Sequence, residues 1–108
     1  MAEESLVTVT ITAETAEWLA EFTRRLVADR LAACGNIVPA VRSIYSWNGE
    51  VQDDAEALVL IHTRASLVDA IIRRADDEHP YDTPQVLAVP LTGAHPGYAD
   101  WVVEQTIG

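Results

Sequence analysis

Two residue types in this chain can bind soft or borderline metal ions: a single cysteine, Cys34, and three histidines, His62, His79 and His95. Thiolate and imidazole groups favour ions such as copper and zinc. The chain has no CxxC or HxxxH pair, so spacing along the sequence does not by itself define a metal site. A lone cysteine often serves instead as a small buried hydrophobic residue.

A predicted β-hairpin can bring Cys34 and His62 together. Asn48-Gly49 separates two β-rich runs, and this dipeptide favours a type I′ turn because both central residues of that turn need a positive φ. Counting back from a two-residue turn pairs Gly35 with His62, which places His62 near Cys34. Pro39 predicts a bulge in the first arm, and a bulge would shift this register.

The other two histidines lie in predicted loops. His79 begins the segment His-Pro-Tyr-Asp between a helix and a strand. It could ligate a metal, contact an anion together with Arg42 and Arg64, or place a positive charge at the end of the preceding helix. His95 lies in a turn rich in glycine and proline, which is typical of a solvated loop histidine.

Aromatic residues near the hairpin tip are also candidates. Tyr45 and Trp47 are large enough that we expect them to pack against another chain or a loop, with ligand binding as the alternative. The loop residue Tyr81 could bind a ligand or simply fold its loop.

The elements that must position these residues follow from the residue patterns. We expect a strand over 5–12, a helix capped by Thr12 and ending near Ala33, the hairpin, a second helix, a strand over 86–91 and a short closing helix. Ser66 and Asp69 have capping-box spacing at the start of the second helix, and His79-Pro80 ends it. The order β-α-β-β-α-β predicts an α+β, ferredoxin-like fold, a single domain over 1–108 with a C-terminal helix.

Composition excludes several classes of function. The 108 residues carry 17 acidic and 7 basic side chains, a formal net charge of −10, which argues against nucleic acid and anionic membrane surfaces as partners. No apolar run approaches the ~20 residues that cross a bilayer, and the start Met-Ala-Glu-Glu-Ser does not resemble a signal peptide. We expect a cytoplasmic protein. The chain has no phosphate-binding glycine loop and no nucleophile elbow, so we expect no enzymatic activity.

Four segments, taken in order, resemble the CutA family of divalent-cation tolerance proteins. They are Arg-Leu-Ala-Ala-Cys-Gly-Asn-Ile over 30–37, Ser-Ile-Tyr-Ser-Trp-Asn-Gly over 43–49, His-Pro-Tyr-Asp-Thr-Pro-Gln-Val over 79–86 and Tyr-Ala-Asp-Trp over 98–101. The resemblance covers nearly the whole chain. It implies a ferredoxin-like subunit in a tight homotrimer, with long hairpin strands that pair across subunits.

The resemblance also implies a function, tolerance of divalent metals with copper binding. The resemblance implies that the cysteine and His-Pro-Tyr segments lie toward clefts between subunits. The residues that match the family's pattern are Cys34, Tyr45, Trp47, His79, Tyr81 and Trp101. Four positions depart from it: His62 stands where lysine is common, Gln85 where glutamate is usual, Gly35 where valine is usual, and Ser46 within the usual tryptophan-rich run. We therefore expect a divalent cation, copper foremost, bound by Cys34 with His62 or His79 at such a cleft. The alternatives are a small-molecule signalling module similar to the PII proteins and a trimeric scaffold for other proteins.

Overall fold

The computed structural model describes residues 5–108. The prediction that the chain does not begin with a signal peptide falls on residues that lie outside this range. The elements, in chain order, are β1 (Leu6–Ala13), α1 (Ala16–Ala28), β2 (Cys34–Trp47), β3 (Glu50–Arg64), a 3-10 turn (Ala65–Leu67), α2 (Val68–Glu78), β4 (Val86–Pro90) and α3 (Pro96–Gln105). This order confirms the prediction of β-α-β-β-α-β with a closing helix.

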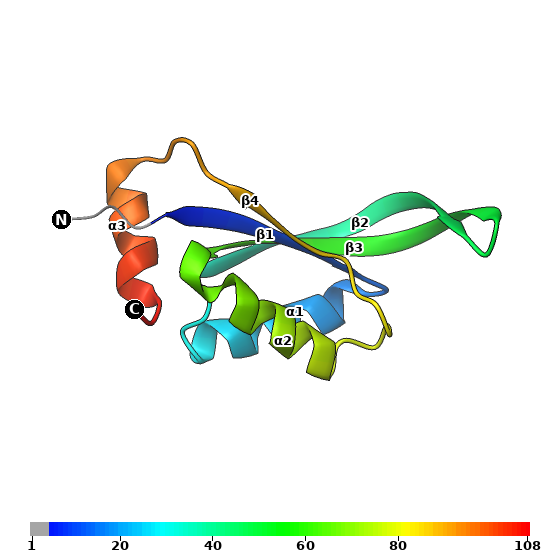
Figure 1. Cartoon of the computed structure of the whole chain (residues 1–108), viewed down its shortest axis with the longest axis horizontal. Coiled ribbons are helices and arrows are strands. Elements are labelled where there is room, and N and C mark those ends of the chain that lie inside the picture. The colour runs from blue at the N-terminus through cyan, green and yellow to red at the C-terminus, as the bar shows by residue number, and fades with distance from the viewer. Residues whose placement is uncertain (1–4) are drawn as a thin grey trace.

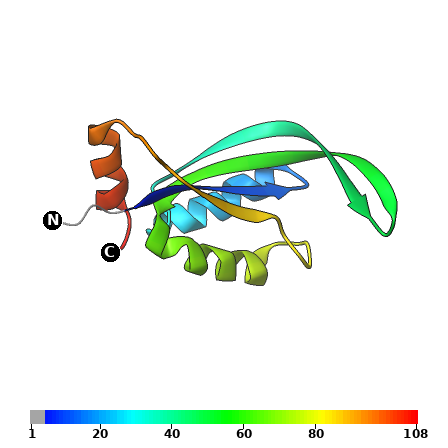
Figure 2. The ribbon, with the colours of Figure 1, turned by 45° about the horizontal axis from the view of Figure 1, so that its top comes forward.

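The four strands form one antiparallel sheet in the order β2-β3-β1-β4. Helices α1 and α2 lie side by side against one face of the sheet, and the other face is open (Figure 1). The β2–β3 hairpin extends past the helical layer at one end, and α3 stands at the opposite end (Figures 1 and 2). The sheet therefore has a covered face, an open face and two distinct ends.

The core lies between the sheet and the two helices. Along β1, Val7, Val9 and Ile11 are buried while the threonines at the alternate positions are less so, as expected of a strand with one face on a core. Phe22 on α1 is fully buried and stacks on Trp18 at 4.9 Å between ring centroids. Helix α1 approaches β2 closely at Gly35, where an added Cβ would come within 2.4 Å of the Thr23 Cγ2.

The hairpin confirms the predicted turn and corrects the predicted register. Asn48 and Gly49 have φ values of 51° and 77°, in the left-handed region that the type I′ turn needs. The predicted bulge is present, and lies between Val38 and Val41. There two residues of β2 stand opposite one residue of β3, so the partner of His62 is Cys34 and not Gly35.

Three predicted helix boundaries are wrong. Helix α1 is capped by Thr15, whose Oγ1 accepts from the Trp18 N–H at 3.1 Å, while Thr12 belongs to β1. It ends at Ala28 and not near Ala33, because the chain leaves the helix at Arg30, where φ is 62°. The expected N-cap of the second helix, Ser66, lies within the 3-10 turn, and the N-cap of α2 is Leu67.

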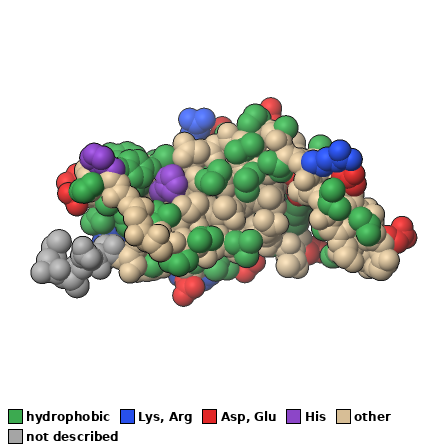
Figure 3. Space-filling view, turned by 90° about the horizontal axis from the view of Figure 1, so that it is seen from above, with side chains coloured by type: hydrophobic (Ala, Val, Ile, Leu, Met, Phe, Trp, Pro, Cys, Tyr) green, Lys and Arg blue, Asp and Glu red, His purple; other side chains and the backbone are tan. Residues whose placement is uncertain are grey.

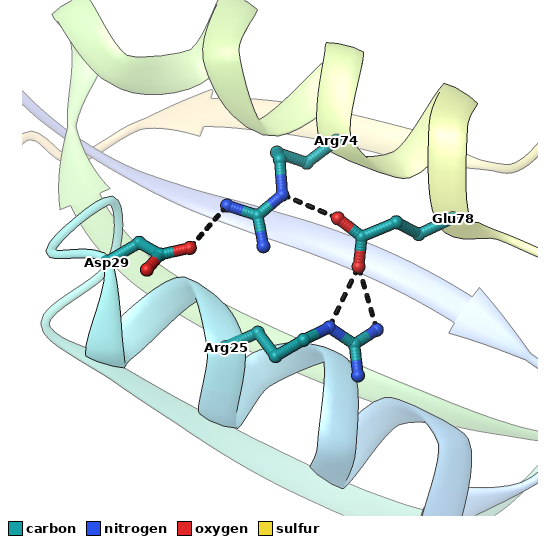
Figure 4. Close-up of polar contacts among 4 residues, drawn as sticks. All are labelled: Arg25, Asp29, Arg74 and Glu78. Atoms are coloured by element: carbon teal, nitrogen blue, oxygen red, sulfur yellow. Dashed lines mark hydrogen bonds and ion pairs between the residues drawn. The ribbon is translucent and has the colours of Figure 1, made fainter.

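A network of ion pairs joins the two helices on their outer side (Figure 4). Glu78 at the end of α2 accepts from the guanidinium groups of Arg25 on α1 and Arg74 on α2, at 2.8 and 2.5 Å. Arg74 also donates to Asp29 Oδ2 at 2.7 Å. The guanidiniums hold the pKa of Glu78 below its usual value, although burial, the largest single influence, acts in the opposite direction.

We expect Glu78→Gln to lower the free energy of unfolding at pH 7 by about 2 kcal/mol, because it leaves the part-buried Arg74 and the more exposed Arg25 without their shared carboxylate. The folded-state pKa of Glu78 lies below its unfolded value, so this contribution is present above the ordinary glutamate pKa of about 4.3 and is lost as the pH falls through the folded-state pKa. Urea unfolding at pH 7 and pH 3 measures both effects. Asp29→Asn is the control, since the Asp29 side chain is 58% exposed and we expect less than about 1 kcal/mol. Equal stability of wild type and Glu78→Gln at pH 7 would contradict this account.

The open face of the sheet carries Cys34 and His62 among aliphatic and uncharged polar side chains. Residues that pair across a ladder share a face, and the registers place Leu60, Leu87 and Val89 on the face of Cys34 and His62, opposite to the core. Leu87 and Val89 are 55% and 54% exposed. Seen from this side, apolar side chains are spread over the middle of the face, and the visible acidic ones lie toward its rim (Figure 3).

Candidate metal site

Cys34 and His62 are direct partners across the β2–β3 ladder. The backbone N–H of Ala33 donates to the His62 carbonyl at 3.0 Å, which holds the two strands together next to the pair. Directly opposed residues of an antiparallel pair have Cβ atoms about 4.5–5.5 Å apart on one face. A thiol and an imidazole are therefore neighbours on the open face, and both residues are half-buried.

A third side chain, Tyr98 of α3, completes this cluster. Its hydroxyl lies 2.9 Å from His62 Nδ1, and the two rings meet edge to face at 85° with centroids 5.8 Å apart. Burial, and then the interaction with the Cys34 side chain, raise the pKa of Tyr98 to about 12. The phenol is therefore protonated at neutral pH, hydrogen-bonded to His62 and close to Cys34.

Helix α3 is held in place by two arginines distant in sequence. Arg30 donates to the carbonyls of Glu104 and Gln105 at 2.7 and 3.2 Å, and Arg64 donates to the Val103 carbonyl at 2.6 Å. The last carbonyls of a helix have no partner within it and carry partial negative charge. Both positively charged guanidinium groups therefore interact favourably with the C-terminal end of α3. They fix the helix that carries Tyr98 over the Cys34–His62 pair.

His79, the other predicted partner of Cys34, lies elsewhere. Its Nε2 is 2.8 Å from the Thr12 carbonyl, and its Nδ1 accepts from the Tyr81 N–H at 3.0 Å. On β1, the residue that pairs with His62 is Thr8, four residues from Thr12, which corresponds to roughly 13 Å along a strand. His79 is buried, and both of its ring nitrogens contact backbone groups, so within one chain the structure brings His62 and not His79 to Cys34.

The aromatic candidates divide between two places. Trp101 packs against Tyr98 with ring centroids 5.5 Å apart, beside the Cys34–His62 pair. Tyr45, Trp47 and Tyr81 instead line a hollow where the hairpin leaves the body of the molecule. Tyr45 donates to Asp54 Oδ2, and Tyr81 donates to Glu56 Oε2; burial and then this carboxylate raise the pKa of Tyr81 to about 12.

The charges around these sites are unfavourable for an anionic ligand. The hollow is lined by the carboxylates of Glu14, Asp54, Glu56 and Asp82, and none of its lining residues is basic. The three groups proposed as anion contacts are engaged separately. Arg42 forms a two-point ion pair with Asp53, at 2.8 and 2.7 Å, while Arg64 binds α3 and His79 binds the backbone, as described above.

The donor set of the Cys34–His62 cluster suits a soft or borderline ion but supplies only two good ligands. A closed zinc site has four protein ligands, usually thiolates and imidazoles. Among residues 5–108 no group of three or more histidine, cysteine, aspartate or glutamate side chains is placed to hold a metal ion. The pair fits a metal as part of a site whose remaining ligands come from outside the chain.

Sequence analysis missed Tyr98 as a member of this cluster. Tyr98 and Trp101 share one face of α3, the closing helix that the sequence predicted. The position of that face depends on the arginine contacts of α3, and no local pattern encodes them. His95 caps α3, with its Nδ1 accepting from the Gly97 N–H at 3.0 Å, so this exposed histidine has a structural contact and is not simply solvated.

Residues 7–105 match the family profile described as CutA1 divalent ion tolerance protein. The chain belongs to the CutA1 family. The divalent-cation tolerance protein CutA of Thermus thermophilus is 39% identical over 103 residues, which are 95% of this chain and 98% of the relative. A crystal structure of CutA1 from Oryza sativa superposes with a TM-score of 0.93 at 37% identity, covering 97% of this chain and 96% of that one. The family name describes tolerance of ions and not a chemical reaction.

Other CutA relatives differ in length and in location. The chloroplastic CutA 1 of rice is 44% identical over 81 residues, and this chain spans about half the length of the plant and mouse relatives that it matches, 46%, 44% and 49%. One relative of known structure, from Archaeoglobus fulgidus, is named as periplasmic. No helix within residues 5–108 is long and apolar enough to cross a membrane.

Proposed function

We propose that this CutA1 chain binds a divalent cation, copper foremost, through Cys34 and His62 at a cleft between the copies of a homotrimer, and that this binding underlies a role in metal tolerance. The observation that carries the proposal is the direct pairing of a thiol with an imidazole on the open face of the sheet. Both groups are ligands for copper and zinc, whereas calcium and magnesium prefer oxygen. The proposal needs a reduced thiol, as in the cytoplasmic location expected from the sequence.

Two features support assembly of copies. The open face exposes Leu87 and Val89, and an apolar sheet face is unfavourable in water. The outer edge of β2 is fourteen residues long and has no partner strand among residues 5–108. Long unpaired edges attract other strands, so pairing between copies would cover this edge and place side chains of a second copy near Cys34 at its start.

Titration calorimetry of the reduced protein with Zn²⁺, a redox-inert divalent probe, tests the proposal. We expect wild type to bind, and Cys34→Ser and His62→Ala each to weaken binding more than about 100-fold, beyond the 10–100-fold cost of losing an outer-shell partner. Titration with Co²⁺ adds a direct signature, because a thiolate ligand gives a sulfur-to-cobalt charge-transfer absorption that Cys34→Ser must abolish.

The matched control is His95→Ala, which removes an exposed histidine at the start of α3. We expect it to bind Zn²⁺ as wild type does. Equal binding by wild type, Cys34→Ser and His62→Ala would show that the ion binds elsewhere and would reject the proposed site.

A further inference from the structure

The ring nitrogen of His62 that faces Tyr98 is the one closer to the strand backbone. Tyr98 Oη lies 2.9 Å from His62 Nδ1. Because Nδ1 is bonded to the ring carbon that carries the side chain, it stays near Cβ, and so does the sulfur of the opposing Cys34. In a directly opposed pair, with Cβ atoms about 5 Å apart, a metal bridging the two side chains is therefore reached most easily by Sγ and Nδ1.

The Tyr98 hydroxyl occupies the approach to this bridging position. It is hydrogen-bonded to His62 Nδ1 and lies close to the Cys34 side chain, whose Sγ donates to Asn36 Oδ1 at 3.9 Å. A metal ion bound between Cys34 and His62 would need the same space. An un-ionised phenol, the ordinary form of tyrosine at neutral pH, cannot replace a thiolate or an imidazole as a strong ligand.

We propose that the Tyr98 hydroxyl is a displaceable plug in the Cys34–His62 site, so that a soft metal ion must break its hydrogen bond with His62 and move the phenol aside in order to bind. The inference rests on the proposed function of this pair. Tyr98 therefore lowers the affinity of the site for the metal ion. A residue that oriented His62 for metal binding would raise it. The arginine contacts that anchor α3 keep the plug in place.

The movement of the plug would involve its neighbour. Trp101 packs on the Tyr98 ring and is 39% exposed, so its surroundings change when the phenol turns. The indole N–H signal of Trp101 in a proton–nitrogen NMR spectrum therefore reports displacement of Tyr98 separately from binding of the metal.

The test compares wild type with Tyr98→Phe, which keeps the ring and removes the hydroxyl. We expect Tyr98→Phe to bind Zn²⁺ roughly fivefold to tenfold more tightly, the factor that corresponds to the net contribution of about one hydrogen bond. Without metal, the same variant should shift the His62 ring nitrogen and Cys34 Cβ signals. On Zn²⁺ addition to wild type, the Trp101 signal should move. The matched control is Tyr81→Phe, which loses a hydroxyl bound to Glu56 and should do none of these.

The possible outcomes separate this inference from the proposed function. If Tyr98→Phe binds Zn²⁺ equally or more weakly while Cys34→Ser still abolishes binding, the plug is rejected and the metal site stands. If the metal-free His62 and Cys34 signals do not change in Tyr98→Phe, the bridging hydroxyl is rejected. If neither wild type nor Tyr98→Phe binds Zn²⁺, the proposed function fails and the plug fails with it.

Discussion

Replacing Leu87 and Val89 together with aspartate should convert the proposed trimer of about 35 kDa, three times the 11.8 kDa chain, into monomers. Both side chains are more than half exposed on the open face of the sheet, where the proposal places a second copy. Burying an unpaired carboxylate in such an interface costs several kcal/mol, so we expect the association constant to fall more than about 1,000-fold. Sedimentation velocity of wild type and variant measures the change.

Ile72→Asp is the control for this variant. Ile72 is also a partly exposed aliphatic residue, 37% exposed, but it lies on α2, on the far side of the sheet, and we expect its variant to sediment as wild type does. If the Leu87 and Val89 double variant still sediments as a trimer, the copies associate through another surface. If the wild-type protein sediments as a monomer, no second copy contributes to the proposed site.

His79→Ala should lower the free energy of unfolding by about 3 kcal/mol and leave Zn²⁺ affinity unchanged. The imidazole joins the end of α2 to the Thr12 carbonyl of β1 and to the Tyr81 N–H, and its removal leaves a buried donor or acceptor unpaired, at about 1–3 kcal/mol. The ring also packs between Trp18 and Tyr81, with centroids 4.7 Å from each, and lost aromatic contacts add about 0.5–1.5 kcal/mol. Urea unfolding and calorimetry provide the two measurements.

His95→Ala again supplies the comparison, because this histidine caps a helix at the surface and a lost cap costs about 1 kcal/mol. A His79→Ala protein of wild-type stability would contradict the structural role of the imidazole. A stable His79→Ala protein with strongly weakened Zn²⁺ binding would instead restore His79 as a ligand, supplied to Cys34 from another copy.

The turn and the bulge of the hairpin were predictable from the sequence, and the predicted strand register differs from the observed one by one residue. Asn48-Gly49 specifies the turn because a type I′ turn needs positive φ angles at both central residues. Pro39 indicates the bulge because proline has no N–H to donate to the ladder. The number of residues that the bulge accommodates depends on how the strands twist over the helical layer. That one-residue difference decides whether Gly35 or Cys34 faces His62.

Features that depend on packing between distant segments were not predictable in this way. The apolar residues of 31–33 continue the helical spacing of α1, yet they are buried after a break at Arg30, whose side chain reaches α3. The contact of Tyr98 with His62 follows from that docking of α3. The pattern of one element cannot specify which side chain of a terminal helix will reach a strand from the middle of the chain.

The central claim, a metal ion bound by Cys34 and His62 between copies of the chain, is tested most directly by a copper-soaked crystal of the reduced protein, with anomalous scattering recorded on both sides of the copper absorption edge. The account predicts an anomalous peak within ligand distance of Cys34 Sγ and a His62 ring nitrogen, with the Tyr98 hydroxyl moved away and a second copy of the chain beside the site. Copper peaks only at other residues, with the Tyr98–His62 hydrogen bond intact, would contradict it.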